Sequence, residues 1–209
     1  PLLPLNFIRR DVVMAKLERS SSAHFHILES APGYGKSLAL AQWLHQKKQH
    51  KEAVAWLTLD PKENDPLRLL TYLICAIHSA DNKCVKKSLK ALEDGDALES
   101  IITLVHQELA AMSKVLHLAL DDVHHIQDSQ SLALLEELMA YAPPNLKMYF
   151  TSTSIFPLDV ARFVAQGQCA RYSEHDLALN KEETIQWLSN VIKEPLEPIQ
   201  IDEIHSQSA

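Results

Sequence analysis

Short apolar runs alternate along the chain with longer stretches in which apolar residues recur every three or four positions. The short runs are typical of buried strands and cover residues 24–29, 53–59, 115–120, 146–152 and 169–174. The longer stretches are typical of amphipathic helices and cover residues 37–48, 65–80, 97–112, 131–142, 157–166 and 180–192. Strands that alternate with helices favour a mainly parallel sheet covered on both faces. We therefore predict an α/β fold with a five-stranded sheet.

Residues at the ends of these stretches support several boundaries. Pro66 fits the first turn of the helix over 65–80, where proline is tolerated. Asn180, followed three residues later by Glu183, predicts a capping box at the start of the last helix. Gly167 is expected to stop the helix over 157–166.

Composition narrows the class of protein. The 209 residues are 46% hydrophobic and 22% charged, which predicts a packed core. A formal charge of −7 argues against direct binding of the DNA backbone, which needs clustered Lys and Arg. Cys75, Cys84 and Cys169 are scattered, so neither a disulfide framework nor a zinc site is expected, and a cytoplasmic location fits. No apolar run reaches the roughly 20 residues that span a bilayer, so we expect no membrane partner.

The segment "SAPGYGKS" (30–37) lies between the first predicted strand and the first predicted helix. Its end, Gly35-Lys36-Ser37, matches the Walker A or P-loop pattern G-x-x-x-x-G-K-[ST], although Ser30 replaces the first Gly. Loop amides and a helix N-terminus together form a positive site for phosphate oxygens. Gly33 and Gly35 would allow close backbone approach, and they are two of only four glycines in the chain. The alternative is an ordinary strand-to-helix turn.

On this interpretation the loop holds the phosphates of a nucleotide. Lys36 would reach the β- and γ-phosphates and take part in catalysis, while the Ser37 hydroxyl would bind Mg²⁺. The predicted nucleotide contacts in the loop are Ala31, Pro32, Gly33, Tyr34, Gly35, Lys36, Ser37 and Leu38.

Two adjacent acids follow the apolar run over 115–120. The carboxyl ends of parallel strands open onto one crevice, so these acids should face the phosphate loop. We predict that Asp121 holds Mg²⁺ through water and that Asp122 positions the attacking water. The alternative is a solvated turn or a helix cap.

Three segments, "SAPGYGKSLALAQWL", "AVAWLTLDPKENDPLRLLTYL" and "LHLALDDVHHI", resemble the nucleotide-binding domain of the MalT-like STAND ATPases. The most specific part is residues 56–60 together with Asn64-Asp65-Pro66. The resemblance includes "FIRRDVVMAKL", where Arg10 matches the entry to the family's domain, and extends to "HDLALNKEETIQWL". It therefore covers nearly the whole chain.

The resemblance implies a P-loop domain over residues 1–175, followed by the start of a helical region over 176–209 within a longer protein. Members of this family are ATP-dependent transcription regulators with a LuxR-type helix-turn-helix, so DNA would be bound only through a C-terminal domain absent from this chain. The implied function is an ATP/ADP switch with slow Mg²⁺-dependent hydrolysis and self-association in the ATP state. Arg10 is implied as a further nucleotide contact.

The chain departs from the family at Thr153, where an Arg is expected. The loss of that cation leaves open a non-hydrolysing nucleotide-binding scaffold. A P-loop phosphotransferase is a second alternative, but it would need an acceptor site and usually an Arg-rich lid, which the sequence lacks. His124 is a candidate for a supporting role near the γ-phosphate, and loop packing is its alternative role.

Overall fold

A single five-stranded sheet forms the centre of the computed structural model, which describes residues 7–192 and 200–201. The strand order is β2-β3-β4-β1-β5, and every neighbouring pair is parallel. The strands are β1 (Phe25–Glu29), β2 (Ala53–Thr58), β3 (Leu116–Asp121), β4 (Leu146–Ser152) and β5 (Cys169–Tyr172). The predicted parallel α/β sheet is confirmed.

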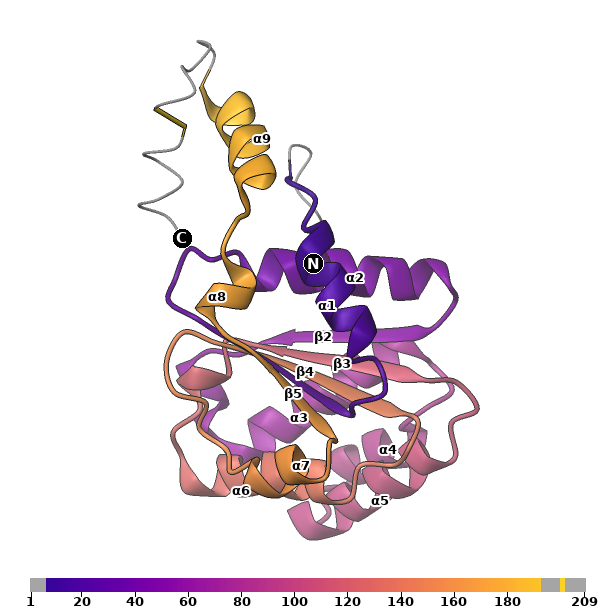
Figure 1. Ribbon diagram of the computed structural model, residues 1–209. Coiled ribbons are helices and arrows are strands. Elements are labelled where there is room, and N and C mark those ends of the chain that lie inside the picture. The colour runs from indigo at the N-terminus through magenta and orange to yellow at the C-terminus, as the bar shows by residue number, and fades with distance from the viewer. Residues whose placement is uncertain (1–6, 193–199, 202–209) are drawn as a thin grey trace.

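Helices cover both faces of the sheet (Figure 1). One face carries α1 (Asp11–Arg19) and α2 (Lys36–Gln49). The other face carries α3 (Pro66–Ala80), α4 (Lys86–Asp94), α5 (Leu98–Ala110), α6 (Ser129–Ala140) and α7 (Ala161–Ala165). The short helix α8 (Glu174–Leu177) leads to α9 (Lys181–Val191), which projects beyond α1 and α2. Two 3₁₀ turns, η1 (Pro61–Asn64) and η2 (Val123–His125), follow β2 and β3.

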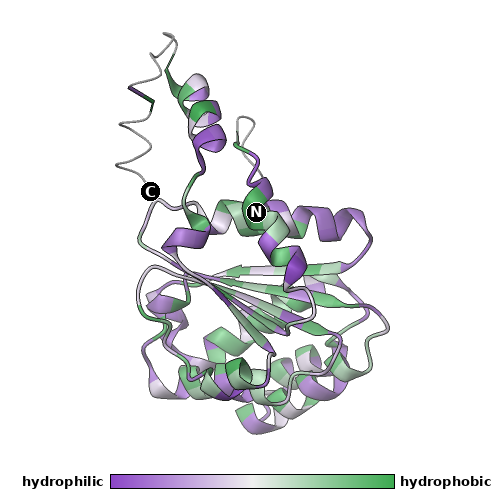
Figure 2. Ribbon diagram, in the orientation of Figure 1, coloured by the Kyte–Doolittle hydropathy of each residue, from purple (hydrophilic) through white to green (hydrophobic). Residues whose placement is uncertain are grey.

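The core consists of two apolar layers, one on each side of the sheet. Hydrophobic residues predominate in the strands, whereas the helices mix hydrophobic and hydrophilic residues (Figure 2). All six residues of β3 are buried, as expected for a strand covered on both faces. Within the described residues, no helix combines the length and apolar character needed to cross a bilayer.

The structure corrects the expected helix over 157–166. Only Ala161–Ala165 is helical. The carboxylate of Asp159 accepts a hydrogen bond from the Ala161 amide at 3.0 Å, and Leu158 and Val160 are buried in the core from irregular backbone. A local side-chain bond thus competes with the first turn of the helix.

The sequence pattern missed three short helices, α1, α4 and α8. The predicted last strand over 169–174 ends at Tyr172, because Ser173 and Asp176 form a capping box that begins α8. The capping box predicted for Asn180 and Glu183 is confirmed at the start of α9.

Candidate functional site

Residues 30–35 connect β1 to α2 at the carboxyl edge of the sheet. Gly33 and Gly35 have φ values of 95° and 71°, in the left-handed region that favours glycine. A Cβ at Gly35 would also lie 3.0 Å from Nη1 of Arg10. The loop therefore requires glycine at position 35 for both backbone angle and space.

The amides of residues 35–38 lie at the N-terminus of α2, and they donate to no protein group within residues 7–192. Unpaired amides at a helix N-terminus favour an anion. The amide of Ala31 differs, because it donates to a carboxylate oxygen of Glu174 at 2.9 Å. Part of the loop is thus open to phosphate, while its first residues are bound to α8.

Lys36 is folded back inside the loop. Its Nζ donates to the carbonyl oxygens of Ser30 at 2.7 Å and Ala31 at 3.0 Å, and the residue is only 5% exposed. Burial lowers the pKa of Lys36, while the negative charges of Asp122 and Asp121 act in the opposite direction. The ammonium group is therefore within electrostatic reach of both predicted acids.

Asp121 ends β3 and is joined to the loop by a hydrogen bond. Its Oδ1 accepts the Ser37 hydroxyl at 2.7 Å and the Thr151 hydroxyl at 2.6 Å. The structure therefore brings together the two residues that the sequence assigns to Mg²⁺.

Hard oxygen donors of this kind suit Mg²⁺, which in phosphate sites takes one or two protein ligands together with waters and phosphate oxygens. Across the residues that the structure describes, no group of three or more His, Cys, Asp or Glu side chains could hold a metal by itself. The Ser37–Asp121 pair thus fits a cation that is completed by a nucleotide.

Asp122 lies one residue beyond the strand in a left-handed conformation, with φ of 61°. Its side chain is 33% exposed, and an oxygen lies 3.9 Å from Nδ1 of His124. The same Nδ1 accepts the amide of Thr153 at 3.4 Å. Burial and the neighbouring His125 lower the pKa of His124. The imidazole is thus placed between Asp122 and the position at which an Arg was expected.

Arg10 was predicted to contact nucleotide, and its guanidinium is turned toward protein carbonyls. It donates to Leu177, to Ala178 at 3.5 Å and to Tyr34 at 3.2 Å, and it lies 3.6 Å from the carboxylate of Glu183. Burial lowers the pKa of Arg10, and the charge of Glu183 opposes that shift. Arg10 therefore ties the phosphate loop to α8 and α9, and a direct nucleotide contact stays a prediction.

An apolar cavity of about 460 Å³ opens beside the phosphate loop. Among the predicted contacts, its lining includes Arg10, Pro32, Gly33, Tyr34, Gly35 and Leu38. The sequence interpretation missed the rest of the lining, which is Ile8, Leu177, Ala178, Leu179, Thr184 and Trp187. These residues lie in the segments 7–17 and 175–188 that the resemblance covers, but nothing in the sequence assigned them to a cavity. Most lie more than 130 positions from the loop, so only the fold assembles them.

A second cavity, of about 630 Å³, lies beside the first residues of the loop. Its lining includes Ser30 and Ala31 from the loop, Thr153 and Ile155 after β4, and Glu174 of α8. It adjoins the loop at the opposite end from the apolar cavity, because the two share only Tyr34.

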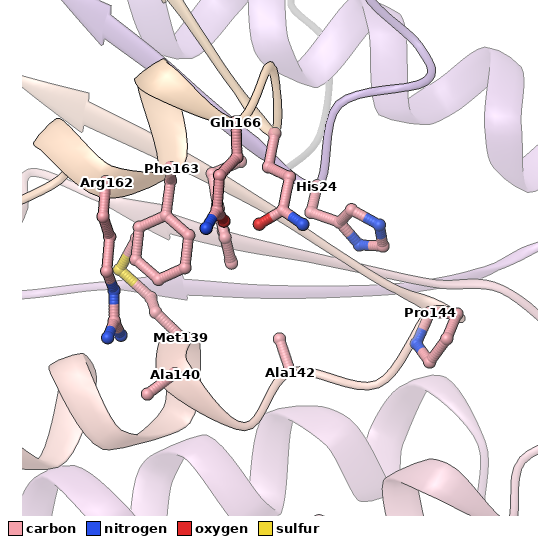
Figure 3. Close-up of a pocket in the computed structure, with 10 residues that line it drawn as sticks. His24, Met139, Ala140, Ala142, Pro144, Arg162, Phe163 and Gln166 are labelled. Carbon is pink, nitrogen blue, oxygen red and sulfur yellow. The ribbon is translucent and has the colours of Figure 1, made fainter.

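A third cavity, of about 390 Å³, lies at the amino ends of β1 and β5, where Phe163 and Arg162 of α7 extend over Met139 and Ala140 (Figure 3). It contains none of the predicted site residues. Ligands of open parallel sheets bind at the carboxyl ends of the strands, so the phosphate loop, and not this cavity, is the candidate site.

Comparison with known proteins identifies sequence relatives but no family profile: no protein-family model matches the chain. The chain is 27% identical over 196 residues to the HTH-type transcriptional regulator MalT of Vibrio cholerae. The matched region covers 93% of this chain and 21% of the relative. The MalT of Cronobacter sakazakii is 28% identical over 193 residues, covering 91% of this chain and 21% of the relative. The chain thus spans about a fifth of the length of the regulators it matches.

Several solved structures share the fold of this chain. A STAND protein with a tetratricopeptide repeat sensor from Pyrococcus horikoshii superposes with a TM-score of 0.65 at 14% identity, over 98% of this chain and 28% of that one. The Walker-type ATPase of Pyrococcus abyssi superposes with a TM-score of 0.57 at 15% identity, over 97% of this chain and 63% of that one. AMPPCP-bound DnaA from Aquifex aeolicus superposes with a TM-score of 0.52 at 15% identity, over 95% of this chain and 55% of that one. At such low identity these superpositions show the fold alone, which is that of P-loop ATPases.

Proposed function

Because this chain is a homologue of the MalT transcriptional regulators and has a P-loop ATPase fold, we propose that it is the ATP/ADP-binding switch domain of such a regulator. The observation that carries the proposal is the hydrogen bond of 2.7 Å between Ser37 and Asp121, beside a helix N-terminus with open amides. Together these features supply a cation site and a phosphate site at one edge of the sheet.

The loop and the apolar cavity bind different parts of the nucleotide. The unpaired amides of residues 35–38 bind the phosphates. The ammonium group of Lys36, which here donates to the carbonyl oxygens of Ser30 and Ala31, would turn toward the phosphates of a bound nucleotide. The cavity of about 460 Å³ receives the base and ribose, because it is mostly apolar and adjoins Gly33 and Leu38 of the loop region. Its size lies within the range of pockets for small ligands.

Hydrolysis is slow and depends mainly on positioning. Mg²⁺ held by Ser37 and Asp121 would neutralise charge on the phosphate oxygens. Asp122 orients the attacking water, and His124 lies close enough to support it. A switch that is reset by hydrolysis needs little turnover.

The rest of the proposal follows the regulators to which the chain is related. Residues 1–175 form the P-loop domain, and residues 176–209 begin a helical region, most of whose second half lies outside the described residues. DNA binding belongs to a part of these regulators outside the fifth of their length that this chain matches. The ATP-bound form self-associates in the cytoplasm.

The absence of an Arg at Thr153 favours a second candidate, a scaffold that binds nucleotide without hydrolysing it. Measured phosphate release from Mg²⁺·ATP decides between them: a steady release that depends on Mg²⁺ supports the switch, and binding without release supports the scaffold. Phosphate transfer to common small acceptors would instead indicate a phosphotransferase.

The binding proposal is tested by the change Lys36→Ala. Hydrogen bonds to charged groups contribute about 1.5–3 kcal/mol, so affinity for Mg²⁺·ADP and Mg²⁺·ATP should fall by about tenfold or more in titration calorimetry. Lys48→Ala is the matched control, because Lys48 is exposed on the same helix. If the Lys36 variant binds both nucleotides as tightly as the parent chain does, the assignment of this loop as the phosphate-binding site is wrong.

A further inference from the structure

The hydroxyl of Thr151 lies buried between the two acids of the site. Thr151 is on β4, next to β3, and is 0% exposed. Its Oγ1 donates to Oδ1 of Asp121 at 2.6 Å and accepts the amide of Asp122 at 2.8 Å. No sequence motif marks this residue.

One hydroxyl can do both because it has one proton and two lone pairs. A carboxylate oxygen only accepts and an amide only donates, so the direction of both bonds is fixed. The result is a continuous chain from the Asp122 amide, through Thr151, to the oxygen of Asp121 that also accepts the Ser37 hydroxyl.

Both acids depend on this contact. Asp122 has φ of 61°, a conformation that is uncommon for residues other than glycine and needs support from its surroundings. The hydrogen bond from the Asp122 amide to Thr151 is such a support, and it fixes the backbone position from which the Asp122 side chain extends. The bond to Asp121 holds the other carboxylate with its Oδ1 toward Ser37.

We propose that Thr151 is a positioning residue that couples the cation-binding carboxylate of Asp121 to the water-orienting carboxylate of Asp122. This inference rests on the proposed function and names a residue that the phosphate-loop pattern does not include. Groups behind metal ligands fix their orientation, and their loss costs about 10–100-fold in metal affinity or activity.

The test compares Thr151→Val with Thr151→Ser. Valine keeps the branched shape and removes the hydroxyl, whereas serine keeps the hydroxyl. Affinity for Mn²⁺ in the presence of ADP is measured by electron paramagnetic resonance of free Mn²⁺, and ADP affinity is measured separately in a chelator. We expect the Val variant to bind Mn²⁺ about 10–100-fold more weakly, with metal-free ADP affinity within about twofold of the parent. The Ser variant should stay within about threefold of the parent in both measurements.

Turnover of ATP gives a second measurement. The Val variant should lose kcat by a similar factor with little change in KM, because the loop amides that bind the nucleotide are untouched. Normal Mn²⁺ affinity in the Val variant overturns the inference. So does an equal loss in the Ser variant, or a parallel loss of metal-free ADP affinity, because each points to general packing and not to the hydroxyl. If the unsubstituted chain binds neither ADP nor Mn²⁺·ADP, the proposed function itself fails, and the inference with it.

Discussion

At the scale of single residues, the candidate site depends on two adjacent acids, Asp121 and Asp122, that lie in different environments. The sequence places an acid at the end of an apolar strand and a serine after the loop lysine, and the fold brings their oxygens to 2.7 Å. The adjacent Asp122 differs in environment: Asp121 is 6% exposed, whereas the side chain of Asp122 is 33% exposed. One acid is thus buried inside the site, and the other is partly open to solvent at its edge.

This difference predicts the effect of Asp122→Asn. An amide cannot accept a proton from water, and general bases contribute typically 10²–10⁴-fold to rate, so turnover of ATP should fall by about a hundredfold or more. Affinity for ATP should stay within about threefold, because the loop and Asp121 are unchanged. Phosphate release at saturating ATP and calorimetry of ATP binding measure the two quantities.

Asp96→Asn is the matched control, because Asp96 is exposed and distant in sequence from both acids. Full activity in the Asp122 variant would exclude this residue as the group that orients water.

The residues that sequence could not predict have a common physical reason. Thr151 and Trp187 belong to a strand and a helix whose local patterns report only burial, and their roles arise from neighbours far away in the chain. Arg10 was found by resemblance, but most of its partners could not be inferred, since they are the backbone carbonyls of Tyr34, Leu177 and Ala178. Motifs identify side chains with distinctive spacing, and they do not identify backbone partners.

At the scale of elements, the strands were easier to predict than the short helices. The central strands β3 and β4 are largely buried on both faces and are predominantly apolar in sequence. Helix α7, with five residues, and helix α8, with four, are too short to show a helical period. The consequence is functional, because α8 joins the phosphate loop through Glu174 and leads directly to α9.

The connection between α1, α8 and α9 depends on the side chain of Arg10, which is 2% exposed and faces Glu183 at 3.6 Å. We expect Arg10→Gln to lower the free energy of unfolding by about 3 kcal/mol, because removal of one partner leaves a buried charge unpaired. Urea denaturation measures the change. Limited proteolysis should also show faster cleavage between α8 and α9.

The neighbouring residue supplies the control. Arg9 makes an exposed ion pair with Asp11, with both side chains about two-thirds exposed. Exposed pairs contribute little, so Arg9→Gln should change the free energy of unfolding by less than about 1 kcal/mol. Equal effects of the two substitutions would show that the buried contact has no special weight.

At the scale of the whole molecule, the predicted architecture is confirmed, and the sheet also contains a buried polar network that the sequence did not indicate. His26 of β1 stacks on Tyr149 of β4, with ring centroids 4.7 Å apart, and its Nδ1 lies 3.1 Å from the Tyr172 hydroxyl of β5. His117 of β3 contacts the Tyr149 hydroxyl at 2.9 Å and the carboxylate of Glu52 at 2.6 Å. The pattern of apolar positions could not reveal this network. The polar residues occur singly within the apolar runs, so the runs are still recognised as buried strands.

The network makes the stability of the fold depend on pH. Burial lowers the pKa of His26 from 6.5 to about 3, and burial also lowers the pKa of His117. Above pH 6.5 these imidazoles are neutral in both states. Below it the unfolded chain binds protons that the folded chain excludes, so stability is complete above pH 6.5 and is lost as pH falls toward 3. Each such histidine can lower the free energy of unfolding by up to about 1.4 kcal/mol for each unit by which the pH falls in this range.

We therefore expect the free energy of unfolding to fall between pH 6.5 and pH 5, and to fall less steeply in His26→Phe, which keeps the ring stacked on Tyr149 but cannot titrate. Urea denaturation at several pH values measures both slopes. Asp176 interferes little in this range, because Lys16 lowers its pKa to about 2 and its contribution to stability is lost only as pH falls below about 4. His50→Gln is the control, because His50 is exposed. If His26→Phe has the same slope as the parent chain, the buried ring is not the group that titrates, and the loss of stability in acid must come from other groups.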